Sequence, residues 1–262
     1  MEKFGIDVSD WQNRIDWETV KPQIDFAIVK LGYGRGNWDD EARNNIEALN
    51  RLGIPYGIYW FSYAYTVGMA ENEARACLRF MEECTARPVY PVFFDWEYAS
   101  REWTDGNDNP VSDGLLRNMT IAFCDGITAA GYKTGVYAND DYVAHHYGKN
   151  WFSEHGLDLW YAYPGASSDH GAAMWQFGRN YIAGIDGKVD VNTCYKDYEE
   201  EEDVEKRFDT IEECPGYAHG TLQHLKSLME SRGQRLGRED GRLDLSEDQL
   251  RILVLLHKAG VF

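Results

Sequence analysis

The sequence lacks the features of several large protein classes. Its 262 residues contain only five cysteines, odd in number and widely spaced, which fits neither a disulfide framework nor a zinc site, so we expect reduced structural thiols. No run of about eighteen apolar residues is present, which argues against membrane insertion. A formal charge of -18 argues against nucleic acid and anionic membrane surfaces as partners, because both select basic patches.

Signals for metal, cofactor or triad chemistry are also missing. The seven histidines show no H-E-x-x-H or related spacing, so we expect neither a metal nor a cofactor. No serine, threonine or cysteine has a histidine at the spacing of a catalytic triad. The first residues, MEKFGIDVSDWQ, contain no apolar signal region, so we expect synthesis in the cytoplasm without a signal peptide.

Strand-like and helix-like segments alternate along most of the chain. We expect strands at residues 4–9, 25–34, 55–65, 90–98, 133–139, 157–164, 172–178 and 188–195. We expect helices near residues 40–52, 69–84 and 112–130. Near-continuous apolar strands separated by helices indicate a mostly parallel sheet covered on both faces. About eight such strands predict a closed barrel of the (β/α) type, whose last strands lack helices.

Two carboxylates stand together at the end of one apolar run, VFFDWEYAS at residues 92–100. Within a strand, residues i and i+2 share a side, so Asp95 and Glu97 should project together while Trp96 faces the helix layer. Asp7 and Asp190 belong to the first and last strands, which become neighbours if the barrel closes. Active sites of parallel barrels lie at this end of the strands. Each acid, taken alone, could equally be a helix cap or an ion-pair partner.

Clustered acids with nearby aromatic residues favour a glycosidase. Carboxylates that share a site cannot all ionise cheaply, so one should have a raised pKa. A carboxylic acid that keeps its proton near neutrality is what glycosidic cleavage needs to protonate the leaving oxygen. Tyrosine and tryptophan residues concentrate at the same strand ends, where sugar rings could stack, although half of them could equally be core.

Six segments resemble the glycoside hydrolase family 25 lysozymes. In chain order they are GIDVSDWQ, GIPYGIYWFSYA, PVFFDWE, GVYAN, MWQFG and VDVN, and the resemblance covers about residues 4–196. It implies an α/β fold with an irregular TIM-like (β/α)5(β)3 barrel. It also implies a peptidoglycan hydrolase that cleaves the β-1,4 bond between N-acetylmuramic acid and N-acetylglucosamine.

The resemblance implies a role for each matching residue. Glu97 matches the general acid, and Asp95 matches its partner, which orients the substrate's 2-acetamido group or stabilises positive charge. Asp7 and Asp190 match two further acids that line the site. Further candidates for substrate contacts are Tyr59, Tyr137, Asn139, Gln176 and Trp160. Tyr33 and the segment WYAYPG depart from the family pattern, which leaves the sugar subsites open.

Two other functions fit parts of the pattern. A chitinase-like N-acetylhexosaminidase is disfavoured because Phe93 stands where the longer D-x-x-D-x-D-x-E motif needs an acid. A non-catalytic glycan-binding barrel is disfavoured because Asp95 and Glu97 are both intact. Acids two residues apart favour a substrate-assisted route, an exception to the usual two-carboxylate schemes.

We expect three segments: a catalytic barrel over residues 1–196, an acidic linker over 197–207 and a small all-α module over 208–262. Apolar stripes at helical spacing predict two helices in the module. The module resembles small segments that follow lytic domains in phage and Firmicutes wall enzymes. It could target the wall, mediate self-association, or pack on the barrel as a hairpin. We therefore expect an endolysin that reaches bacterial peptidoglycan by phage-type release or another export route.

Overall fold

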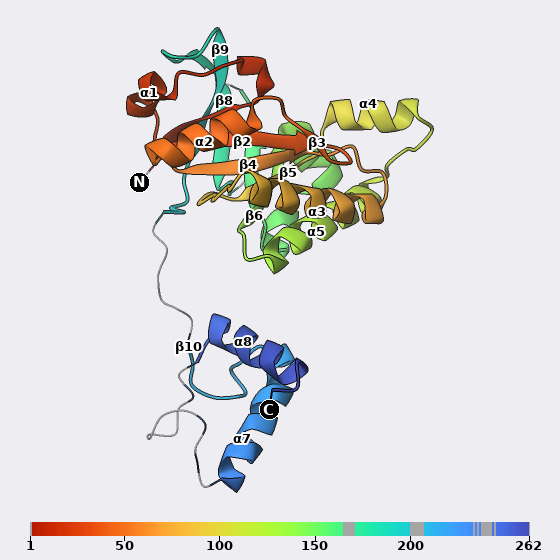
Figure 1. Ribbon diagram of the computed structural model, residues 1–262. Helices are drawn as coiled ribbons and strands as arrows, with labels where there is room; N and C mark the ends of the chain where they lie inside the picture. The colour runs from red at the N-terminus through yellow and green to blue at the C-terminus, as the bar shows by residue number, and fades with distance from the viewer. Residues whose placement is uncertain are drawn as a thin grey trace. The chain divides into compact units, whose positions relative to one another are not determined.

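The computed structural model describes residues 2–164, 171–199, 207–232, 234, 236, 243 and 245–261. The chain forms two compact units, Met1–Glu199 and Glu200–Phe262. Figure 1 shows the barrel of the first unit from red to green and the helices of the second in blue.

Eight strands close into a barrel in the first unit. They are β1 (Lys3–Val8), β2 (Phe26–Tyr33), β4 (Tyr56–Phe61), β5 (Val92–Asp95), β6 (Thr134–Asn139), β7 (Asp158–Ala162), β8 (Met174–Tyr181) and β9 (Lys188–Cys194). Neighbours from β2 to β8 pair in parallel, β9 pairs antiparallel with β8 and β1, and the parallel β1–β2 pair closes the ring. A short strand β3 (Asn37–Trp38) extends β2 antiparallel. The predicted barrel is confirmed.

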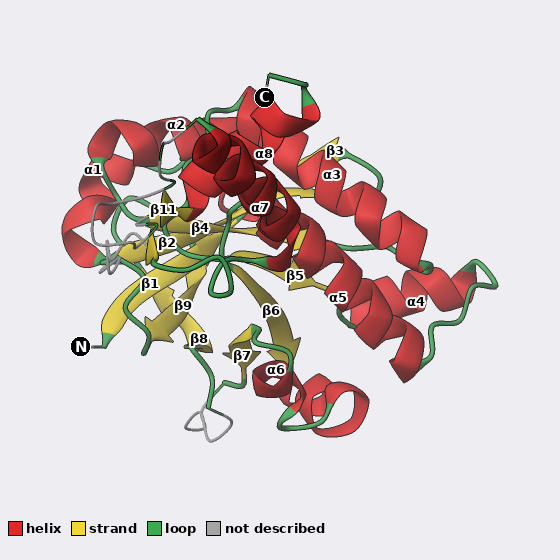
Figure 2. Ribbon diagram, turned by 90° about the horizontal axis from the view of Figure 1, so that it is seen from below, coloured by secondary structure: helices red, strands yellow, loops and turns green. Residues whose placement is uncertain are grey.

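Three long helices cover the outside of the barrel in Figure 2: α2 (Ala42–Leu52), α3 (Val67–Glu83) and α5 (Asp113–Ala129). All three match predicted helices. Side chains cap two of them, because Thr66 accepts the Met69 N–H and Ser112 accepts the Leu115 N–H. The helix α4 (Tyr98–Gly106), directly after β5, was not predicted. Shorter helical turns are η1 (Asp10–Gln12), α1 (Trp17–Val20), η2 (Lys21–Gln23), η3 (Tyr142–Tyr147) and α6 (Trp151–Glu154).

Aromatic side chains fill the lower half of the barrel. Phe26, Phe93 and Trp160 point inward and are buried. Gly5 and Gly135 make room for them, since a Cβ atom at either position would lie 2.5 Å from the ring of Phe26 or Phe93. The inward positions at the carboxyl ends of the strands are polar instead. The aromatic side chains therefore close one end of the barrel interior, and the end at the carboxyl termini of the strands stays open for a site.

The five cysteines are free thiols, as predicted, and burial raises the pKa of Cys77 and Cys124 above the ordinary value. Residues 197–199, predicted as the start of the linker, pack on the barrel instead. Lys3 Nζ lies 2.9 Å from Asp197 and 3.0 Å from Glu199, and Tyr198 is buried beneath the aromatic plug. Residues 200–206 of the predicted linker lie outside the described residues.

The second unit contains the two expected helices, α7 (Gly216–Ser231) and α8 (Glu247–Lys258). A small antiparallel ladder joins β10 (Arg207–Phe208) to β11 (Leu245–Ser246). Its core includes Phe208, Leu222 and Leu250. Among the helices that the structure describes in either unit, none has the length and apolarity that a bilayer crossing requires.

Candidate active site

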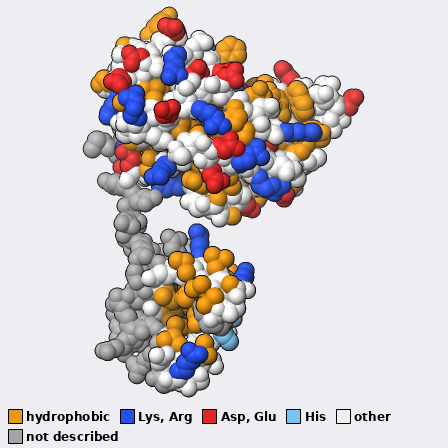
Figure 3. All heavy atoms as spheres, in the orientation of Figure 1, with side chains coloured by type: hydrophobic (Ala, Val, Ile, Leu, Met, Phe, Trp, Pro, Cys, Tyr) orange, Lys and Arg blue, Asp and Glu red, His pale blue; other side chains and the backbone are white. Residues whose placement is uncertain are grey.

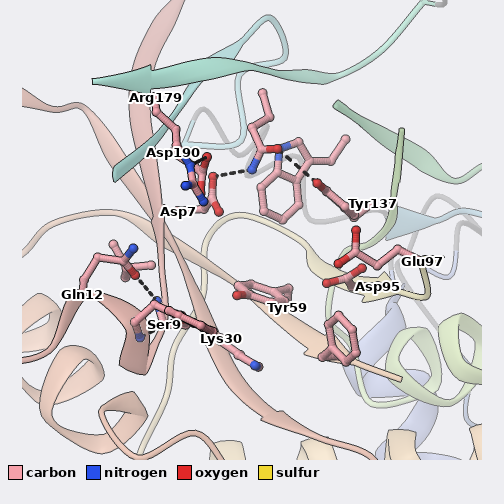
Figure 4. Close-up of a pocket in the computed structure, with 15 residues that line it drawn as sticks. Asp7, Ser9, Gln12, Lys30, Tyr59, Asp95, Glu97, Tyr137, Arg179 and Asp190 are labelled. Carbon is pink, nitrogen blue, oxygen red and sulfur yellow. Dashed lines mark hydrogen bonds and ion pairs between the residues drawn. The ribbon is translucent and has the colours of Figure 1, made fainter. Parts of the chain in front are cut away.

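A cavity of about 550 Å³ opens at the carboxyl ends of the barrel strands. The lining residues are Asp7, Val8, Ser9, Trp11, Gln12, Lys30, Tyr59, Phe61, Asp95, Glu97, Tyr137, Trp160, Gln176, Arg179 and Asp190. Figure 4 shows Asp95 and Glu97 on one side and Asp7 and Asp190 on the other, with Tyr59 between them. The cavity thus brings together every predicted site residue except Asn139, and its acids form two groups that face each other.

Asn139 is not among the residues that line the cavity. Its Oδ1 accepts the backbone N–H of Tyr142 at 3.0 Å, so the side chain holds the start of η3. Asn139 is the last residue of β6, where a substrate contact and a helix cap look alike in sequence. In the structure the Asn139 side chain bonds the backbone at the start of η3.

Asp7 and Asp190 are paired by the register of β1 and β9. Asp7 Oδ2 accepts hydrogen bonds from Gln176 Nε2 at 2.9 Å and Asn192 Nδ2 at 2.8 Å. Burial, followed by the charge of Asp190, raises the pKa of Asp7 to about 7. Arg179 reaches Asp190 from β8 with Nε at 2.9 Å and Nη2 at 3.3 Å.

Hydrogen bonds extend this group across the barrel. Trp160 Nε1 donates to Asn192 Oδ1 at 2.7 Å, and the Tyr137 hydroxyl donates to Gln176 Oε1 at 3.1 Å. The side-chain amides of Asn192 and Gln176 therefore each accept a hydrogen bond from an aromatic side chain through the oxygen and donate one to Asp7 through the nitrogen. Because every member is fixed by a partner, the wall is rigid before any ligand arrives.

A pH dependence follows from the buried Asp7 carboxyl. Its pKa is about 7 in the folded protein, above the ordinary value, so between about pH 4 and 7 the folded state keeps a proton that the unfolded chain has lost. Stability from this group therefore falls as the pH rises, by about 1.4 kcal/mol per pH unit over that window. We expect the Tm of Asp7→Asn to rise relative to wild type between about pH 4.5 and pH 8. A difference that stays constant with pH would contradict this assignment.

Asp95 and Glu97 reach the cavity from different elements. Asp95 is the last residue of β5, whereas Glu97 stands just before α4, with its backbone N–H 3.3 Å from Ser100 Oγ. The prediction that one strand carries both acids was wrong, because the chain turns into a helix after Asp95. Trp96 faces the helix layer as predicted; it is buried, and its Nε1 donates to Ala64 O at 3.0 Å.

The electrostatics of this pair favour a shared proton. Burial, reinforced by the charge of Glu97, raises the pKa of Asp95 well above the ordinary value. Burial also raises the pKa of Glu97, while the Lys30 ammonium opposes both shifts. Asp95 Oδ1 is buried and has no hydrogen-bond partner among the residues that the structure describes. Two coupled carboxyls so placed lose their protons in separate steps, and Glu97, which is only half-buried, faces the cavity.

Sequence reasoning missed the two cations of the cavity, Lys30 and Arg179. Lys30 is the one charged residue of β2 and stands two positions after the inward-facing Ile28, so alternation alone would have aimed it into the barrel. Arg179 stands opposite Asp190 in the β8–β9 ladder, a pairing visible only once the register is known. Trp11, 84% exposed at the rim, was missed as well.

Residues 6–185 match the family described as glycosyl hydrolases family 25. The chain belongs to glycosyl hydrolase family 25. The family resemblance found in the sequence is thereby confirmed. No curated protein sequence matches the chain significantly.

Solved structures support the family 25 fold. The modular autolysin LytC of Streptococcus pneumoniae is 29% identical with a TM-score of 0.63, and the match covers 74% of this chain and 47% of LytC. This chain thus spans about half the length of LytC, which has also been solved with a synthetic peptidoglycan ligand.

Two endolysin structures share the fold at lower identity. The catalytic domain of endolysin ply40 from bacteriophage P40 of Listeria monocytogenes is 22% identical with a TM-score of 0.62, and the match covers 76% of this chain and 95% of that domain. The CTP1L endolysin is 17% identical with a TM-score of 0.61, and the match covers 98% and 99% of the two chains.

Proposed function

We propose that this family 25 protein is a peptidoglycan hydrolase, a muramidase that cleaves the β-1,4 bond between N-acetylmuramic acid and N-acetylglucosamine. The observation that carries the proposal is the pair of carboxyls of Asp95 and Glu97 at the open end of the barrel, whose pKa values are both raised by burial. The autolysin and endolysin relatives support peptidoglycan as the substrate and the bacterial cell wall as the site of action.

Glu97 acts as the general acid in this proposal. Its carboxyl faces the cavity, and burial raises its pKa, which favours the protonated form that a general acid needs. Transfer of that proton to the glycosidic oxygen lets the leaving sugar depart as a neutral alcohol. Lys30 sits close enough to affect both carboxyls and would steady the negative charge left on Glu97.

Asp95 assists the substrate's own acetamido group. A cavity-facing oxygen of the Asp95 carboxylate can accept the acetamido N–H, which makes the acetamido oxygen a better nucleophile toward the anomeric carbon. That oxygen displaces the protonated leaving group and forms a cyclic oxazolinium ion, which water then opens. The route retains configuration. Net inversion in the first-formed product would rule it out.

Product analysis tests the bond assignment. Purified peptidoglycan is digested, the new reducing ends are reduced with borohydride, and the products are identified by mass spectrometry. We expect reduced N-acetylmuramic acid ends. Reduced N-acetylglucosamine ends would keep a glycosidase but favour the hexosaminidase alternative, and an absence of new ends would favour a glycan-binding barrel.

For the second unit we propose wall targeting, with self-association as the alternative. It has its own small core, and α8 exposes Ile252 and Leu255 at 56% and 66% of their surface. An apolar helix face of this kind favours an interaction role.

Deleting residues 200–262 is expected to leave the cleavage rate on soluble muropeptides within about twofold of wild type. Lysis of whole walls is expected to fall about tenfold or more, because the enzyme would lose the raised concentration at the wall surface that a targeting unit provides. The measurement compares initial rates on both substrates, with light scattering of the intact protein to detect self-association. An equal loss on both substrates would indicate a structural role instead.

A further inference from the structure

A second hollow, of about 510 Å³, lies between α3 and the β2–β3 turn, and its lining contains three arginines and no acidic residue. The lining residues are Arg35, Met69, Asn72, Arg75, Ala76 and Arg79. Such a grouping is unusual in a chain with 44 acidic and 26 basic residues. Figure 3 shows Lys and Arg side chains over the surface where Figure 1 draws α3. We call this feature the arginine hollow.

The backbone builds the arginine hollow from two elements. Arg75 and Arg79 project from α3, and Arg35 comes from the turn between β2 and β3. Gly36 has a φ of +110°, a conformation that favours glycine, and so shapes the turn that carries Arg35. Arg79 Nε is 3.7 Å from Glu83, and Arg75 Nη2 is 2.6 Å from Asn72 Oδ1. Among the residues that the structure describes, neither guanidinium therefore has a close bidentate carboxylate partner.

A row of aromatic rings connects this hollow to the cavity. Phe61 lines the cavity, its ring centroid is 5.1 Å from that of Tyr63, and Tyr63 is 5.3 Å from Trp103. Trp103 is 6.2 Å from Tyr65, whose hydroxyl is 3.3 Å from Arg35 Nη2. We call Phe61, Tyr63, Tyr65 and Trp103 the aromatic strip. Trp103 is 42% exposed in this row, and an exposed aromatic face of this kind can pack on a sugar ring.

A buried carboxyl holds the strip in place. The Tyr63 N–H donates to Glu73 Oε1 at 3.2 Å, and Glu73, on α3, is fully buried. The helix that carries two arginines of the hollow thus also fixes the loop that carries Tyr63. Strip and hollow therefore form one rigid surface, already shaped before a ligand binds.

We propose that this surface binds a glycan strand outside the cavity, with sugar rings on the aromatic strip and a peptide-stem carboxylate in the arginine hollow. The proposal rests on the proposed function and adds a preference for strands that carry peptides. Its occupant follows from charge complementarity and from continuity with the cavity through Phe61. Wall phosphate polymers are the competing source of negative charge.

The test uses the full chain with Arg75→Gln and Arg79→Gln combined. Substrates are peptidoglycan strands with intact peptide stems, the same strands after amidase removal of the stems, and walls with or without their phosphate polymers. We expect kcat/KM to fall about tenfold on stem-bearing strands, mainly through KM, and to stay unchanged on stem-free strands. The matched control combines Arg51→Gln and Arg87→Gln, which removes the same charge elsewhere on the surface.

Each other outcome overturns the inference. An equal loss on both kinds of strand, or no loss on either, would remove the stem carboxylate as the ligand. A loss that appears only on walls retaining their phosphate polymers would assign the hollow to phosphate. Failure of the proposed function looks different, because wild type would then release no reducing ends from any strand.

Discussion

The Glu97→Gln variant is expected to lose about two to four orders of magnitude in kcat on peptidoglycan while folding normally. Glutamine keeps the shape of the side chain but has no proton to give to the leaving oxygen. The backbone of residue 97 holds the start of α4, because its N–H donates to Ser100 Oγ at 3.3 Å and its carbonyl accepts the Arg101 N–H at 3.0 Å, and the substitution retains both bonds. Initial rates of reducing-end release, with Tm as the check on folding, measure the effect.

A matched control makes this result specific. Glu102→Gln removes the same charge from an exposed position on α4, next to Glu97 in the fold but outside the cavity lining. It is expected to stay within about twofold of wild type, since surface changes of this kind have little effect. If Glu97→Gln turned over as fast as Glu102→Gln, Glu97 would not be the acid.

The alternation of inward and outward side chains along the strands accounts for most of the site residues that could be predicted from the sequence. Asp7, Tyr59, Asp95 and Tyr137 all stand at inward positions near the carboxyl ends of parallel strands. The side chains of a strand alternate between its two faces with a period of two residues. This alternation can be read from one strand alone, without knowing how neighbouring strands are aligned. The barrel and the gathering of these side chains at one end were therefore predictable.

Features that depend on non-local geometry could not be read in this way. The Arg179–Asp190 pair follows from the β8–β9 register, and the separation of Asp7 and Asp95 to opposite walls follows from the barrel diameter. The end of β5 at Asp95 was missed because Trp96 and Tyr98 suit a strand by propensity. A helix forms there instead, with Ser100 meeting the Glu97 N–H.

The Asp95→Asn variant is expected to be nearly as inactive as Glu97→Gln, with kcat lowered by about two to three orders of magnitude. The substitution preserves shape but removes the negative charge that would polarise the acetamido N–H. Asp95 is buried and its pKa is raised, so its ionised form costs stability and that cost grows as the pH rises. The Tm of Asp95→Asn should therefore equal or exceed that of wild type above neutral pH, which separates lost catalysis from lost folding.

The residual activity of Asp95→Asn carries a second signature. In wild type the two carboxyls titrate as a coupled pair, so the last proton is lost beside a carboxylate, and this moves the alkaline limb of the kcat/KM profile to higher pH. Without the Asp95 carboxylate, the alkaline limb of the kcat/KM profile should move to lower pH. A merely structural role for Asp95 would not produce this shift. Asp105→Asn, at an exposed position on α4, serves as the control and should leave rate and limb unchanged. An unmoved limb in Asp95→Asn would mean that Glu97 titrates independently, and the shared proton would have to be abandoned.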